Sequence, residues 1–267
     1  MIGTKTLGYT LTTAALETAR TVILRSGAVE YILNLAAERR GVGGRPSTGV
    51  APGLGAVLTV WLAIIRIGRV PSVAESHRAL EALDAEQREF LGIPEGPLLS
   101  YAAFHAWLTR LLEPLDSGAD LPARRITNRE QRARVAERSL DQRRKSADAA
   151  EHRHRVVNLL IAGSIDEPTP EGSAGDIVAD ETIIDLAGST EGLGTKPEKY
   201  RGAAYIGGYY MRDRTTGTAQ TGGSARYITK QGFGIGVTAV SRIGSPSNLY
   251  GIAPVITGIA IHAGCVR

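Results

Sequence analysis

Residues 175–186 read GDIVADETIIDL, and at this stretch the sequence pattern changes from helical to extended. The apolar residues here are mostly β-branched, and Gly175 and Gly188 bracket them, which is typical of a β-strand. Four acids lie in the same stretch: Asp176, Asp180, Glu181 and Asp185. A carboxylate in a buried strand is costly unless it is paired, hydrogen-bonded or bound to a metal, so acids at these positions require a physical reason.

Before this stretch, up to about residue 160, apolar residues recur at three and four spacings, which predicts helices. Residues 11–40 predict two helices broken near Ser26 and Gly27. Ser72, followed three residues later by Glu75, is typical of a capping box at the start of a helix. Further helices are expected at 54–67, 71–93, 100–112 and, opened by Asn128, 128–162. The N-terminal region is therefore predicted to be all-α.

From about residue 165 the apolar runs shorten and glycine becomes dense. We expect three strands, at 177–184, 232–243 and 253–263, the last two joined as a hairpin by GSPSNLYG. The glycine-rich residues 187–231 indicate a long insertion of low order between the first two strands. The GFGIG run lacks the spacing of a phosphate-binding loop and indicates close backbone approach in a strand. The predicted fold class is α+β, with a helical region at 1–160 and an α/β domain at 165–267.

The composition is that of a soluble globular protein, with 43% hydrophobic and 22% charged residues among 267. The only cysteine, Cys265, excludes a disulfide framework or a multi-thiolate metal site within one chain. The most apolar run, Leu54 to Ile65, is shorter than the roughly 20 residues that a membrane helix needs. The N-terminus has no secretory signal pattern. We therefore expect a cytoplasmic protein with no membrane partner.

Positive charge is concentrated between Asp120 and Arg155, where eleven Lys or Arg stand against six Asp or Glu. This asymmetry favours a polyanionic partner, and a solvated helix of mixed charge is the alternative. The candidate phosphate-binding residues are Arg124, Arg125, Arg129, Arg132, Arg134, Arg143, Arg144 and Lys145.

The helix at 100–112 allows two interpretations. Its face with Ser100, Tyr101 and His105 could enter a major groove and read bases. Its other face, with Phe104, Trp107, Leu108 and Leu111, has the spacing of a helix packed in a core, which is the favoured interpretation.

Four stretches together resemble the cut-and-paste insertion-sequence transposases of bacteria, which are of the DDE type. They are RRITNREQRARV, GDIVADETII, GGYYMRDR, and GFGIGVTAVSRI with APVITGIAIH. The resemblance implies a partial RNase H-like catalytic domain at 165–267 and double-stranded DNA as partner. It implies that Asp180 is the first catalytic acid and a ligand of Mg²⁺ or Mn²⁺, and that Thr182 supports the end of its strand. Two such ions activate water and stabilise the leaving oxygen of a phosphodiester.

In that family the second and third acids follow the third strand, whereas this sequence ends at Arg267, just past it. The resemblance thus implies a truncated transposase that does not cleave DNA by itself, with a second copy or an intact transposase as protein partner. Two alternatives stay open. One is a non-catalytic DNA-binding protein, and the other is a decayed product that does not fold stably.

Overall fold

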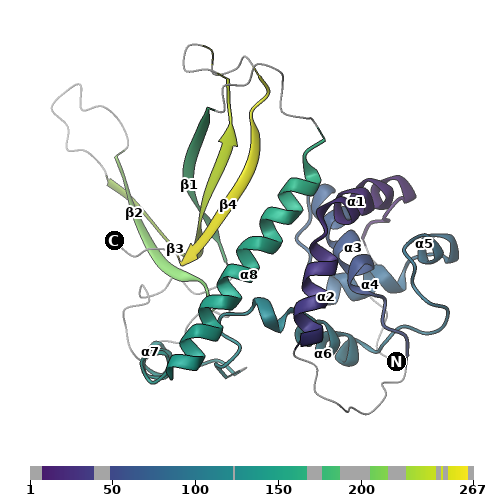
Figure 1. Cartoon of the computed structure of the whole chain (residues 1–267), viewed down its shortest axis with the longest axis horizontal. Helices are drawn as coiled ribbons and strands as arrows, with labels where there is room; N and C mark the ends of the chain where they lie inside the picture. The colour runs from purple at the N-terminus through teal and green to yellow at the C-terminus, as the bar shows by residue number, and fades with distance from the viewer. Residues whose placement is uncertain are drawn as a thin grey trace. The chain divides into compact units, whose positions relative to one another are not determined.

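The structure is a computed structural model that describes residues 8–38, 49–122, 124–166, 176–186, 205–215, 227–244, 248 and 252–263. It combines helices with one antiparallel sheet, so the predicted α+β class is confirmed (Figure 1). Two compact units make up the chain, and both are discontinuous in sequence. The first unit contains Met1–Pro114 and Arg155–Pro168, and the second contains Leu115–His154 and Thr169–Arg267.

The first unit begins with two helices, α1 (Thr13–Ser26) and α2 (Ala28–Glu38), which are separated by one residue. That residue, Gly27, has a φ of 66°, in the left-handed region where glycine carries no steric penalty. Thr12 caps α1 by accepting a hydrogen bond from the backbone N–H of Ala15 at 3.2 Å. The break predicted near Ser26 and Gly27 is confirmed.

Four more helices follow in the described part of this unit: α3 (Leu54–Arg66), α4 (Val73–Glu81), α5 (Ala85–Phe90) and α6 (Tyr101–Leu112). Ser72 caps α4 through the backbone N–H of Glu75 at 3.0 Å, as predicted. The reciprocal capping box lies one helix later, between Asp84 and Gln87 of α5. These caps fix the residue at which each helix starts. The start of a helix in turn fixes which of its side chains face the neighbouring helices.

The core of the first unit centres on α3, which packs against α1 and α4. Val57, Val60 and Ile64 of α3 are fully buried, each worth about 1.5–3 kcal/mol when removed from water. In α6, Phe104 and Leu108 are buried as well, which confirms the core interpretation of that helix face. Among the described helices, none combines the length and apolarity that a bilayer crossing requires.

The basic segment forms two helices, α7 (Asn128–Ala136) and α8 (Leu140–Ser164), joined to α6 by a short 3-10 helix, η1 (Glu113–Leu115), and a loop. The prediction of one helix from Asn128 is therefore wrong. Thr127 is the cap of α7, and Asn128 is buried in its first turn. Ser139 and Gln142 exchange backbone-to-side-chain hydrogen bonds of 2.9 and 3.2 Å, so a capping box restarts the chain as α8.

The second unit contains a sheet of four described strands: β1 (Ile177–Asp185), β2 (Gly208–Thr215), β3 (Tyr227–Arg242) and β4 (Val255–Ala263). β3 pairs antiparallel with each of the others, and its second half lies between β1 and β4 (Figure 1). Arg242 lies opposite Val255, which confirms the predicted hairpin of the last two strands.

The stretch 187–231, expected to be an insertion of low order, contains β2 and the first residues of β3, paired from Gly208 opposite Gly234 to Thr215 opposite Tyr227. That expectation is wrong for these residues, since glycines and polar residues interrupt the apolar alternation that marks a strand in sequence. The remainder of the stretch lies outside the described residues. The RNase H-like arrangement of the domain stays a prediction.

Close packing over glycines shapes β3. The predicted close backbone approach lies at Gly234, where an added Cβ would be 2.5 Å from the carbonyl oxygen of Ile184, and aromatic or imidazole rings cover the glycines on either side. Gly232 lies opposite Tyr210, and a Cβ at Gly232 would come within 2.6–2.8 Å of the Tyr210 ring and hydroxyl. Gly236 lies opposite His262, whose ring atoms would be 2.1–2.9 Å from an added Cβ. Alternate strand residues share a face, so both rings cover the same face of β3.

Candidate nucleic-acid interface

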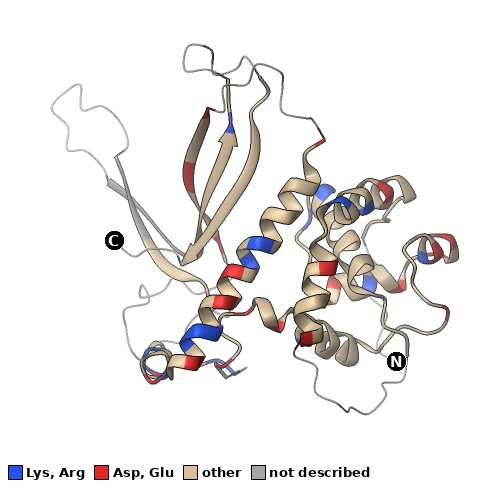
Figure 2. Cartoon of the chain, in the orientation of Figure 1, with Lys and Arg blue, Asp and Glu red and all other residues tan. Residues whose placement is uncertain are grey.

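A surface rich in arginine is formed by residues 124–145, which cover the approach to α7, α7 itself and the start of α8. We call it the basic surface. It carries nine Lys or Arg against three Asp or Glu, a net charge of +6. Figure 2 shows Lys and Arg, drawn in blue, along α7 and the first turns of α8. All eight cations predicted to bind phosphate are exposed: Arg124, Arg125, Arg129, Arg132, Arg134, Arg143, Arg144 and Lys145.

Glu130 is the anionic centre of this surface. Arg124 donates to its carboxylate at 3.0 Å, and Arg134 donates to it at 3.0 Å from the next turn of α7. The hydrogen bond from Arg124, with that from Arg134, lowers the pKa of Glu130 from its ordinary value. One carboxylate thus holds two arginines in place and neutralises only one of their charges.

Arg143 orients itself on the preceding helix. Its Nε donates to the carbonyl of Arg138 and its Nη2 to that of Ala136, both at 3.1 Å. Carbonyls at the end of a helix lack an intrahelical partner and attract cations. Lys145 pairs with Asp141 at 2.7 Å on an exposed face of α8. These contacts leave the cationic groups accessible to solvent, where phosphate can reach them.

Arg138 has a different role, which the sequence does not reveal. Its side chain is 11% exposed, and its guanidinium grips Asp120 through Nε at 2.8 Å and Nη2 at 2.6 Å. The Nη1 group donates to Ser146 at 3.2 Å, and Ser146 donates to the carbonyl of Ser117 at 2.8 Å. This network fixes the turn between α7 and α8 against the loop before them.

Two further residues of α8 have structural roles that spacing alone cannot predict. Arg153 is half-buried and donates to the carbonyl of Leu115 at 3.1 Å, and burial lowers its pKa against the opposing effect of Asp116. The Nε2 atom of His154 lies 2.5 Å from the carbonyl oxygen of Ile261 and 3.1 Å from its nitrogen, so it contacts the outer edge of β4. Both contacts hold the part of α8 up to His154 within the second unit.

The predicted catalytic acid, Asp180, lies in the middle of β1, opposite Ala239 of β3, with Thr182 opposite Val237. Its side chain is exposed, like most of β1, so the expectation of acids in a buried strand is wrong. The acids of β1 are solvated, which removes the cost of burying them.

The neighbouring acid, Glu181, points to the other face of the sheet from Asp180, because successive strand residues alternate. There Glu181 lies 3.7 Å from His262, which in turn lies 3.4 Å from the hydroxyl of Thr238. Within the described ranges, no three His, Cys, Asp or Glu residues gather closely enough to hold a metal ion. A Mg²⁺ or Mn²⁺ site at Asp180 therefore stays a prediction.

The predicted groove-reading face of α6 is partly engaged within the fold. The hydroxyl of Ser100 accepts from the backbone N–H of Ala103 at 3.4 Å and caps the helix. Tyr101 is exposed, with its ring centroid 5.8 Å from that of His77. Base reading by this helix stays a prediction.

Comparison with protein-family models, with curated proteins and with solved structures gives no match to this chain.

Proposed function

We propose that this chain binds double-stranded DNA through the basic surface of α7 and the start of α8, as a protein that contacts the phosphate backbone. The observation that carries the proposal is the net charge of +6 on residues 124–145, with eight of the nine cationic side chains exposed. The short helix α7 and the first turns of α8, joined by a fixed turn, present these charges together, as a contact with consecutive phosphates requires.

Binding of this kind is electrostatic and largely independent of sequence. Each phosphate that a cation neutralises releases condensed counterions, so the logarithm of the affinity falls by about 0.9 per phosphate for each tenfold rise in salt. Arginine suits the role because its planar guanidinium forms paired hydrogen bonds with phosphate oxygens. Glu130, Asp141 and the helix-end carbonyls hold the arginines and lysine in position without cancelling the surface charge.

The test is direct binding of the purified chain to short labelled duplexes of unrelated sequence, followed by fluorescence anisotropy. We expect similar affinities for all of them and loss of affinity as salt rises. Because Asp180 is remote from the basic surface in sequence and carries no cationic group, Asp180→Ala should bind as the unaltered chain does. Failure to bind any duplex at low salt would overturn the proposal.

A relation to insertion-sequence transposases is the second candidate. It is supported by the order of the described strands, with the acid-bearing β1 followed by the β3–β4 hairpin. In this scheme Asp180 supplies one ligand of a Mg²⁺ or Mn²⁺ site, and the other ligands come from a second copy or an intact transposase. Nicking of element-end DNA by a mixture of this chain and an intact transposase, abolished by Asp180→Ala, would support it. An unchanged rate would contradict it.

A decayed product without stable structure is the remaining alternative. It predicts aggregation and fast proteolysis, because apolar strands of the sheet would lack neighbours. Far-ultraviolet circular dichroism with a cooperative thermal transition would exclude it.

A further inference from the structure

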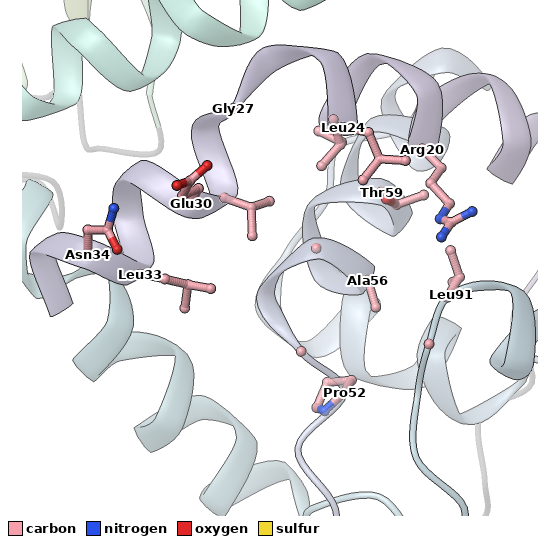
Figure 3. A pocket seen from close by; sticks show the side chains of 15 residues that line it. Arg20, Leu24, Gly27, Glu30, Leu33, Asn34, Pro52, Ala56, Thr59 and Leu91 are labelled. Atoms are coloured by element: carbon pink, nitrogen blue, oxygen red, sulfur yellow. The ribbon is translucent and has the colours of Figure 1, made fainter. Parts of the chain in front are cut away.

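A hollow of about 520 Å³ opens in the first unit, between α1, α2, α3 and the turn that follows α5. Its lining is mainly apolar (Figure 3). Pro52, Ala56 and Leu33 contribute to it, and Gly27, Gly53, Gly55 and Gly92 add no side chain. The glycines leave room, so the hollow can admit side chains from outside the unit.

Two leucines at the hollow face solvent, although an apolar side chain is more stable when it is buried. Leu24 of α1 is 65% exposed and Leu33 of α2 is 38% exposed. Burying a leucine side chain removes it from water at a favourable free energy, so such residues beside an open hollow mark a contact surface. The same surface thus supplies both protruding apolar groups and the space to receive them.

Charged groups of opposite sign stand at opposite ends of this hollow. Arg20 of α1 lies at one end near Leu91, and Glu30 lies at the other end with Asn34 (Figure 3). The guanidinium of Arg20 is 4.7 Å above the ring of Phe90, which holds it in place. Glu30 lies in the first turn of α2, where the helix dipole favours a carboxylate.

We propose that this hollow is the interface between two copies of this chain, related by a two-fold axis through its middle. In an isologous contact, a residue that meets a second residue of the partner is itself met by that second residue from the other side. Arg20 of each copy therefore faces Glu30 of its partner, and the pair occurs twice. Leu24 and Leu33 of each copy then enter the space that the glycines leave in its partner. The charge arrangement selects this occupant, since a surface with one cation and one anion at its two ends complements itself. The proposal does not depend on DNA binding.

Charge reversal tests the pairing. The unaltered chain of 267 residues should sediment at twice 28.3 kDa. Arg20→Glu alone places two glutamates together at both ends, and Glu30→Arg alone places two arginines together, so each variant should sediment as a monomer. An equimolar mixture of the two variants restores an opposite pair at both ends of a heterodimer, and the mixture should therefore recover the dimer mass.

Recovery in the mixture also shows that each single variant is folded. Glu38→Arg, an exposed reversal at the end of α2 outside the hollow, is the matched control and should remain dimeric. A monomeric unaltered chain at high concentration would overturn the proposal, and so would a dimer that survives Arg20→Glu. Monomers in the equimolar mixture overturn it as well, and binding of a small apolar probe such as a naphthalene sulfonate to a monomeric chain would then identify a ligand pocket instead.

Discussion

Arg138 and Asp120 form a forked ion pair, with the guanidinium Nε 2.8 Å from Oδ2 and Nη2 2.6 Å from Oδ1. The pair is largely shielded from water, since the side chains are 11% and 25% exposed. It joins the loop before α7 to the turn between α7 and α8. This turn sets the direction in which α7 and the start of α8 present their charges.

Replacing Arg138 with Lys should destabilise the chain by about 2 kcal/mol, because lysine cannot keep both hydrogen bonds to the carboxylate and leaves Asp120 partly unpaired. Urea unfolding followed by circular dichroism measures the change. The matched control is Asp141→Asn, which removes only the exposed pair with Lys145 and should cost less than about 0.5 kcal/mol. Equal effects for the two variants would show that the forked pair has no special role.

The acids of β1 should protect the sheet from aggregation. Among the described strands β1 pairs only with β3, and Ile177, Val178 and Ile184 are exposed on it. An exposed apolar edge strand is a template for pairing with another chain, and charges on it oppose that pairing. Asp180→Val with Glu181→Val should therefore aggregate on mild heating, as measured by light scattering.

The control for the aggregation of the valine variant replaces the two acids with residues of opposite charge. Asp180→Lys with Glu181→Lys keeps two like charges on β1 and should stay soluble under the same conditions. If the lysine variant aggregates as much as the valine variant, the acids have a specific role other than repulsion. A metal ligand at Asp180 would be such a role.

Two neighbouring glycines of β3 should respond differently to alanine. A Cβ at Gly234 would lie 2.5 Å from the backbone carbonyl oxygen of Ile184, which cannot move without shifting β1. At Gly236 the added Cβ meets the His262 ring, which can rotate away. Gly234→Ala should thus lower the thermal transition more than Gly236→Ala does.

A double substitution checks the stated cause. His262→Ala should remove most of the cost of Gly236→Ala in a thermal melt, because the clash is with that ring. It should not reduce the cost of Gly234→Ala. Additive effects in both pairs would refute the packing of His262 over Gly236.

The raised pKa of Tyr9 should make the folded state less stable at alkaline pH. Burial of its hydroxyl, followed by the nearby Glu75 carboxylate, raises the pKa of Tyr9 from 10.0 to about 12. Between these values the unfolded chain releases the tyrosine proton and the folded chain keeps it, so unfolding is favoured as pH rises. This contribution to stability is complete below pH 10 and is lost between pH 10 and about 12.

Thermal melts across that pH range measure the effect. Tyr9→Phe should show a smaller fall in the transition temperature between pH 10 and 12 than the unaltered chain does. Tyr101→Phe is the control, because Tyr101 is exposed and should leave the fall unchanged. A parallel fall in all three proteins would mean that Tyr9 does not titrate as described.

The helices of the first unit follow from local signals in the sequence. Gly27 ends α1, Ser72 starts α4, and the apolar spacing of α6 places Phe104 in the core. These features depend on neighbours within a few residues, which periodicity and caps describe well. For the same reason the break before α8 could have been predicted from the capping box of Ser139 and Gln142.

Contacts between distant residues are harder to infer. Nothing in the spacing of Arg138 separates it from the exposed arginines of α7, since its partner Asp120 lies on a preceding loop. Likewise, the β-branched apolar residues of β1 suggest a buried strand, and only the fold shows that most of its side chains face solvent. The sequence did not predict β2, because apolar and polar residues do not alternate in the glycine-rich start of β3 with which β2 pairs.

The most direct test of DNA binding is the salt dependence of affinity for one duplex, measured by fluorescence anisotropy. For about six phosphate contacts the slope of log affinity against log salt should be roughly −5. Arg144→Gln with Lys145→Gln, and separately Arg129→Gln with Arg132→Gln, should make the slope shallower by about 1 per residue removed. Arg66→Gln with Arg110→Gln changes the net charge equally at two exposed positions of the first unit and should leave the slope unchanged. If the control alters the slope as much as the α7 and α8 variants do, the basic surface is not the DNA-binding site.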